Sequence, residues 1–358
     1  MSIAAEERAG LATIIARATE ALFPGYFALV MATGVVSIAS FLLGHEPFAQ
    51  LLVWLNWLFY VALWALTFLR IIAFPSRIAD DLFDHQRAPG FFTTVAGTCV
   101  LGTQSTIVAN APTIGLVLWW LGLGLWFVIM YAFLTAVTIR SSKPSLGDGI
   151  NGAWLIAAVA TQSIVILRGV LDGPYPPSPQ VQLLSLAMFM VGTMIYLAII
   201  PLIFYRLTFV RFESRDFSPP YWINMGAVAI TTLAGSTLIA LGNRWPVLAG
   251  FEPILRGFTV FCWAVATWWI PFLLALMVWR HVIRRDPIDY EPQLWGMVFP
   301  LGMYTTGTFQ LSHALGFEFL VAVPKAFIFV AVIAWTATFF GLLHHLVQTI
   351  RGAPRQPG

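Results

Sequence analysis

The chain has 358 residues, of which 59% are hydrophobic and only 10% are charged. A soluble domain carries roughly 25% charged residues, so the composition excludes an ordinary globular protein and indicates an integral membrane protein. The net charge of +3 is small and lies between apolar runs, so it indicates membrane topology and not a surface for nucleic acid.

Ten membrane helices are predicted along the chain, because the apolar runs are ~20 residues or longer, where barrel strands would be ~10 residues and alternating. They cover residues 22–44, 48–73, 89–110, 112–139, 150–171, 180–208, 219–241, 252–282, 291–314 and 322–349. They form one transmembrane domain over residues 22–350. A short N-terminal tail (1–21) and a C-terminal tail (351–358) flank it.

The basic residues predict the orientation. All but four of the 19 Lys and Arg residues fall on one side when the segments between helices are numbered alternately. The exceptions are Arg168, Arg244, Arg256 and Lys325. By the positive-inside rule, the richer side is cytoplasmic. We therefore expect a multi-pass protein of a bacterial inner (plasma) membrane with both termini in the cytoplasm.

The odd-numbered helices resemble one another. Each begins with an aromatic residue that often follows Pro or Gly: Phe27, Phe92, Trp154, Trp222 and Trp295. Proline suits the first turn of a helix because its missing N–H has no partner there. Five such helix pairs at a regular spacing predict an all-α protein with five helical hairpins in a quasi-fivefold ring around a central pore.

The two sets of helices differ in composition. The odd-numbered helices are richer in Ser and Thr, and the even-numbered helices hold most of the Trp residues. Bulky aromatic residues suit a lipid boundary, and small hydroxylated residues suit an interior that packs closely or touches water. We therefore expect an inner ring of odd helices. Its predicted pore-lining residues are Thr33, Ser37, Thr94, Thr98, Thr161, Thr232, Ser236 and Thr305.

Each of these residues also has an ordinary interpretation, which is tight helix packing with the hydroxyl bonded to the carbonyl four residues earlier. No Asp or Glu lies in the middle of an odd helix, so a pore there favours an anion over a cation. Positive groups near the outer ends are candidates for an anion-attracting mouth, with solvated or snorkelling side chains as the alternative. They are Arg168, Arg256, Lys325 and His313.

Phe299 is the candidate gate, because an apolar ring at a constriction excludes water. Pro300 follows it, lacks an N–H and so frees the carbonyl of Gly296, which kinks the helix. The alternative is that Phe299 is one of 29 phenylalanines packed against a neighbour.

Three segments resemble a known family. They are Phe23-Pro-Gly-Tyr-Phe27 followed by Met31-Ala-Thr-Gly34, then Trp222-Ile-Asn-Met-Gly-Ala227, and Trp295-Gly-Met-Val-Phe299-Pro300. Their order is similar to that in the tellurite-resistance/dicarboxylate transporter family, which includes bacterial tellurite-resistance protein A, plant slow anion channels, and fungal malate and sulfite transporters. The resemblance implies five hairpins around a pore, a homotrimer with one pore per subunit, and a gating role for Phe299.

The expected function is therefore an anion channel or transporter for small anions such as chloride, nitrate, sulfite, tellurite and C4-dicarboxylates. The alternative is a proton-coupled carrier for C4-dicarboxylates or oxyanions, which needs a titratable group at membrane depth. An enzyme is not expected, because no buried acid–base pair or metal-ligand spacing is visible. No cofactor, metal or nucleic acid is expected, and the partners are anions, membrane lipid and further copies of the chain.

Overall fold

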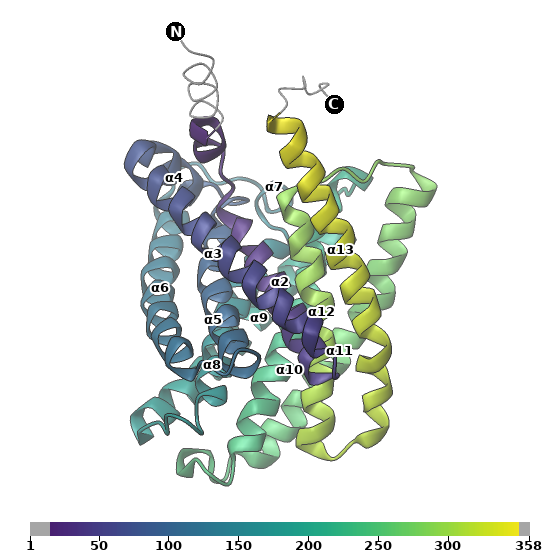
Figure 1. Cartoon of the computed structure of the whole chain (residues 1–358). Helices are drawn as coiled ribbons and strands as arrows, with labels where there is room; N and C mark the ends of the chain where they lie inside the picture. The colour runs from purple at the N-terminus through teal and green to yellow at the C-terminus, as the bar shows by residue number, and fades with distance from the viewer. Residues whose placement is uncertain (1–14, 351–358) are drawn as a thin grey trace.

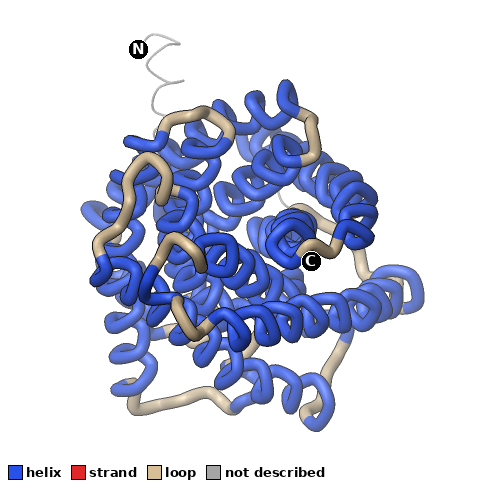
Figure 2. The backbone as a smooth tube through the Cα atoms, turned by 90° about the horizontal axis from the view of Figure 1, so that it is seen from below, coloured by secondary structure: helices blue, strands red, loops and turns tan. Residues whose placement is uncertain are grey.

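The computed structural model describes residues 15–350, and within them every regular element is a helix (Figure 1, Figure 2). The ten long helices are α2 (Ala28–Leu42), α3 (Glu46–Ala73), α5 (Phe92–Ile107), α6 (Pro112–Ile139), α8 (Ile156–Val170), α9 (Pro179–Phe209), α10 (Ile223–Leu241), α11 (Glu252–Val278), α12 (Trp295–Leu315) and α13 (Ala322–Ile350). These bounds agree with the ten predicted ranges to within a few residues, and the all-α class is confirmed. The predicted tail 351–358 and residues 1–14 lie outside the described residues.

Eight of the long helices, some with a short leading turn, are apolar enough to cross a membrane by length and composition. The two others are α5 and α12, whose sequences are diluted by Thr, Ser, Gly and Gln. Both are nevertheless buried along almost their whole length. They are shielded by other helices of the same chain, so they need less hydrophobicity than a helix that faces lipid.

The contacts between helices form a closed cycle. Helix α2 packs on α5, α5 on α8, α8 on α10, α10 on α12, and α12 back on α2. Each of the other five long helices packs chiefly on the inner helix that precedes it: α3 on α2, α6 on α5, α9 on α8, α11 on α10 and α13 on α12. Burial separates the sets clearly. The inner spans over α2, α8 and α10 are 83–89% buried, and the outer spans are 22–39% buried.

A 3₁₀ turn precedes each inner helix. The turns are η1 (Pro24–Phe27), η2 (Ala88–Phe91), η3 (Gly152–Leu155), η5 (Pro219–Trp222) and η8 (Pro292–Leu294). They contact one another in the same cyclic order, so all five inner helices begin at one end of the molecule, and we name this set of turns the collar. It belongs to the end of the molecule at which α13 ends (Figure 1).

Glycine is required where two turns of the collar meet. A Cβ atom on Gly90 would lie 2.7 Å from the backbone nitrogen of Gly25, and one on Gly152 would lie 2.0 Å from the carbonyl oxygen of Pro220. Neither backbone can give way without moving its whole turn. The Pro and Gly residues that recur before each aromatic therefore build the collar: Pro starts the turn and Gly permits the close approach.

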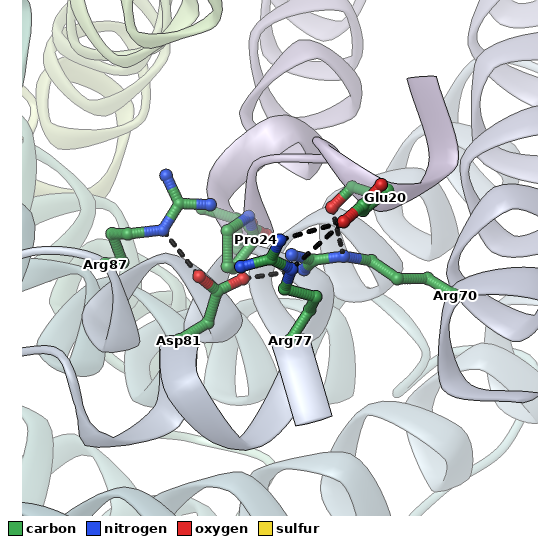
Figure 3. Close-up of polar contacts among 7 residues, drawn as sticks. Glu20, Pro24, Arg70, Arg77, Asp81 and Arg87 are labelled. Carbon is green, nitrogen blue, oxygen red and sulfur yellow. Dashed lines mark hydrogen bonds and ion pairs between the residues drawn. The ribbon is translucent and has the colours of Figure 1, made fainter. Parts of the chain in front are cut away.

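A buried ion cluster holds the collar to the outer helices at α4 (Pro75–Phe83), a short helix that the sequence analysis did not predict (Figure 3). The Asp81 carboxylate accepts from Arg70 Nη1 at 2.6 Å and from Arg87 Nε at 2.5 Å. Arg70 Nε also donates to the carbonyl of Glu20, 3.2 Å away, and Arg77 pairs with the Glu20 carboxylate at 2.9 Å (Figure 3). The cluster thus joins the end of α3, α4, and the segments that lead into η1 and η2.

The substitution Asp81→Asn is expected to destabilise the protein strongly. The side chains of Arg70 and Asp81 are only 4% and 7% exposed, so Asn leaves a buried guanidinium without its counter-charge, at a cost of about 3–5 kcal/mol. Glu20→Gln is the matched control, because it removes an exposed ion pair worth about 0–1 kcal/mol. The midpoint of thermal unfolding of the purified protein in detergent measures both. Equal midpoints for the two variants would contradict a stabilising role for Asp81.

Candidate functional site

The five inner helices enclose a cavity on the axis of the ring. Each helix contributes three lining residues at positions i, i+3 and i+7: Val35, Ile38 and Leu42; Val100, Thr103 and Ile107; Ser163, Ile166 and Val170; Ile230, Leu233 and Thr237; Met303, Thr306 and Gln310. The spacing is that of one face of a helix. The cavity is narrow, with a volume of about 30 Å³, so it has room for only about two water molecules.

Exposure of the lining rises steadily along the axis. The first layer, which holds Val35 and Met303, is at most 5% exposed, and the second layer, which holds Ile38 and Thr306, is at most 6% exposed. All five residues of the third layer are partly exposed: Leu42, Ile107, Val170, Thr237 and Gln310. The cavity therefore opens where the inner helices end and narrows toward the collar, where they begin.

The lining is mostly apolar, and its hydroxyl groups are already engaged. Thr103 donates to the carbonyl of Cys99 at 3.0 Å, and Thr306 donates to that of Gly302 at 3.1 Å. Ser163 and Thr237 likewise donate to carbonyls of their own helices, at 2.7 Å and 2.8 Å. A hydroxyl group that donates to a carbonyl of its own helix has a hydrogen-bond partner where no water is available. The proton of each hydroxyl is thus directed at the backbone, and only the oxygen lone pairs remain.

Phe299 lies on α12 one turn closer to the collar than Met303, on the same face of the helix, and it is only 1% exposed. The residues that precede the other first-layer positions by one turn are Met31, Ala96, Val159 and Gly226, and all four are buried. Phe299 is the one aromatic residue in this layer. By helical spacing, Phe299 is thus the largest residue in the layer that follows the closed end of the cavity.

Pro300 packs against the neighbouring helix α10. A Cβ atom built on Gly226 would lie 2.7 Å from Pro300 Cγ, so this contact requires glycine at position 226. The ring of Pro300 also removes one backbone donor from α12, and the carbonyl four residues earlier loses its helical partner. Helix α12 is thus locally weakened next to Phe299 but held in place by α10.

The hydroxyl groups that were predicted to line the pore bond to other parts of the protein instead. None of the eight is among the residues that line the cavity. Four of them contact the outer ring: Thr33 accepts from Trp335 Nε1 at 3.0 Å, Thr161 accepts from Trp126 Nε1 at 2.8 Å, Thr98 bonds Tyr60 at 2.9 Å, and Ser37 donates to the carbonyl of Ala49 at 2.8 Å. The other four donate to carbonyls of their own helices: Thr94, Thr232, Ser236 and Thr305.

The four predicted mouth residues do not line the cavity either. Arg168 is buried, donates to the carbonyl of Tyr175, and lies with its guanidinium carbon 5.6 Å from the ring centre of Trp119. Arg256 is exposed and pairs with Glu252 on its own helix at 2.9 Å. The last two are exposed near the cavity end of the molecule: Lys325 and His313.

The sequence analysis named none of the fifteen lining residues, and Gln310 is the one among them with a side-chain amide. It is the last lining residue of α12, it is partly buried, and its amide makes no hydrogen bond within the described part of the chain. The sequence repeat shared by the five inner helices could have identified the lining residues. The first-layer residues follow the five helix-initiating aromatics by about two helical turns each, so aligning the repeats on those aromatics identifies the lining face.

Comparisons with known proteins identify the family and several relatives. A family model described as voltage-dependent anion channel matches residues 21–343. An uncharacterized membrane protein of Mycobacterium tuberculosis is 38% identical over 156 residues, which is 44% of this chain and 79% of that protein. An uncharacterized transporter of Methanocaldococcus jannaschii is 25% identical over 303 residues, 82% of this chain and 85% of the relative. A sulfite efflux pump of Arthroderma benhamiae is 21% identical over 342 residues, 88% of each chain.

Thr161→Val is expected to lower stability without changing which ions pass. The substitution leaves the indole N–H of Trp126 without its partner at a buried contact between α6 and α8. Such bonds within membranes are worth about 0.6–1.7 kcal/mol. Thr232→Val is the control, because that hydroxyl bonds only to its own helix at Val228. Thermal unfolding in detergent compares the two. A larger fall in the unfolding midpoint for Thr232→Val than for Thr161→Val would contradict the proposed importance of the bond between Trp126 on α6 and Thr161 on α8.

Proposed function

Because the chain belongs to the voltage-dependent anion channel family, we propose that this multi-pass membrane protein is a channel for small anions. The resemblance drawn from the sequence motifs is confirmed by this membership. The observation that carries the proposal is the axial cavity, to which all five inner helices contribute the same three positions. A path along the axis requires a lining to which all five repeats contribute equally. A pocket for one tightly held ligand would not show this equivalence among the five helices.

The lining favours anions that lose their hydration easily. It offers aliphatic side chains and hydroxyl oxygens but no fixed positive charge, so an ion in the cavity gains little in exchange for its water. We propose chloride, nitrate and sulfite in its singly charged form as the favoured ions, ahead of tellurite and doubly charged C4-dicarboxylates. The relative named as a sulfite efflux pump supports the inclusion of sulfite.

A channel is favoured over a proton-coupled carrier. None of the fifteen lining residues carries an acid, an amine, a guanidinium, an imidazole, a phenol or a thiol. A proton-coupled cycle needs a group that gains and loses a proton along the path. The cavity supplies none, so movement down the electrochemical gradient is the mechanism that the geometry supports.

Phe299 is proposed to close the channel, with Pro300 as the element that lets it move. The buried ring lies beyond the narrow end of the cavity, in a layer whose other members are smaller. An apolar constriction of this kind is dry, and an ion crosses it only if the ring turns aside. The break in the hydrogen-bond ladder at Pro300 lowers the cost of a local change in α12.

The proposal also covers the membrane in which the protein lies, its orientation and its oligomeric state. The distribution of basic residues supports a bacterial inner membrane with the collar and both termini on the cytoplasmic side, so the cavity opens outward. Family membership supports a homotrimer with one conduit per subunit, surrounded by membrane lipid.

Phe299→Ala is expected to raise anion current at least about tenfold, if the closed state is favoured by ~1.4 kcal/mol or more. Two-electrode recording in oocytes or recording in planar bilayers measures the current, with surface expression quantified in parallel. Phe309→Ala is the control, because Phe309 is on the same helix but is partly exposed and contacts His313. Unchanged current for Phe299→Ala at normal surface expression would disprove the gate.

A further inference from the structure

The outermost layer of the cavity contains one free hydrogen-bond donor. Its five members are Leu42, Ile107, Val170, Thr237 and Gln310. Three are aliphatic, and the hydroxyl proton of Thr237 is donated to the carbonyl of Leu233. The amide of Gln310 makes no hydrogen bond within residues 15–350.

The deeper layers add no donor that is free. Their hydroxyls belong to Ser163, Thr103 and Thr306, and each of the three protons is donated to a carbonyl of its own helix. An anion that enters the cavity therefore meets lone pairs and methyl groups from four helices, and N–H groups from Gln310 alone. The Gln310 amide is partly exposed, so its N–H groups are free of protein partners and can exchange water for an anion.

We propose that Gln310 is the residue that determines specificity at the mouth of this conduit, and that its amide binds an oxygen atom of an oxyanion in preference to a halide. The inference rests on the proposed channel function and identifies a substrate class for it, singly charged oxyanions such as nitrate or hydrogen sulfite. The carboxamide is planar and presents two N–H donors in fixed directions. Oxyanion oxygens accept along lone-pair directions, and a bond from N–H to a charged oxygen is short and strong.

The surroundings of Gln310 strengthen this discrimination. The other members of its layer offer no competing donor, and the aliphatic side chains of Leu42, Ile107 and Val170 exclude part of the ion's water. A hydrogen bond is worth more where few waters replace it. The third layer is also partly exposed, so an ion bound there is released readily, as conduction requires.

The first test measures permeability ratios in the Phe299→Ala background, where current is expected to be largest. Reversal potentials in nitrate and chloride gradients give the nitrate-to-chloride ratio with and without Gln310→Leu. The ratio is expected to fall about threefold or more when the amide is removed. Thr237→Val in the same background is the matched control in the same layer, and its ratio should not change because its hydroxyl offers no donor. An unchanged ratio in Gln310→Leu would overturn the proposal.

A second test separates binding from conduction. The thermal unfolding midpoint of the purified protein is measured in sodium nitrate and in sodium chloride at equal ionic strength, for the wild type and for Gln310→Leu and Gln310→Asn. A nitrate-specific rise in the wild type that Gln310→Leu abolishes and Gln310→Asn partly keeps would support the site even if no current were found, in which case only the channel function would fail. The same nitrate-specific rise in Gln310→Leu, or none in the wild type, would overturn the site whatever the current.

Discussion

Polar side chains inside a membrane must find their partners within the protein, because lipid offers none. This constraint organises the whole chain. The indole of Trp335 donates to Thr33 across α13 and α2, that of Trp126 to Thr161 across α6 and α8, and that of Trp263 to Thr308 across α11 and α12. Three tryptophans of the outer ring thus bond threonines of the inner ring across the boundary between the two sets of helices. Each bond also fixes the rotation of an inner helix about its own axis.

The apolar conduit is a consequence of that arrangement. Most of the inner-helix hydroxyls either bind the outer ring or donate to the backbone of their own helices, so few polar groups are left for the axis. The width of the path is then set by side-chain volume alone. Close to the collar the equivalent positions of the other inner helices hold Met31, Ala96, Val159 and Gly226, and α12 alone carries an aromatic residue there, Phe299. Toward the other end, three of the five residues in the last layer are branched aliphatic, and the layer is partly exposed.

The sequence was sufficient to predict the helices but not their rotation. Length, apolar runs, and the Pro or Gly before each aromatic residue placed the ten helices within a few residues of their observed bounds. The rotation of an inner helix is harder, because a helix buried on all sides has no polar face to read. The Ser and Thr stripe predicted the wrong face for cavity lining in residues such as Thr161, since a hydroxyl that faces Trp126 and one that faces water look the same in sequence. Helix α4 was missed because it is only nine residues long and carries several charges. Its contribution to the ion cluster depends on Arg70 and Arg87, which lie outside the helix.

The parallel arrangement of the inner helices gives the conduit a direction. All five begin at the collar, so their partial positive charges gather there and their partial negative charges gather at the open mouth. An anion is therefore favoured near the collar and disfavoured at the mouth, apart from the amide of Gln310. In the proposed orientation, with the collar in the cytoplasm, the resting potential, negative inside, would push a monovalent anion outward with about 2.3 kcal/mol per 100 mV. The helix dipoles raise the local concentration of anions at the entrance, and the membrane potential drives them to the exit. The proposed channel would in this way carry anions outward without a coupling ion, which is consistent with the absence of any titratable side chain among the fifteen residues that line the cavity.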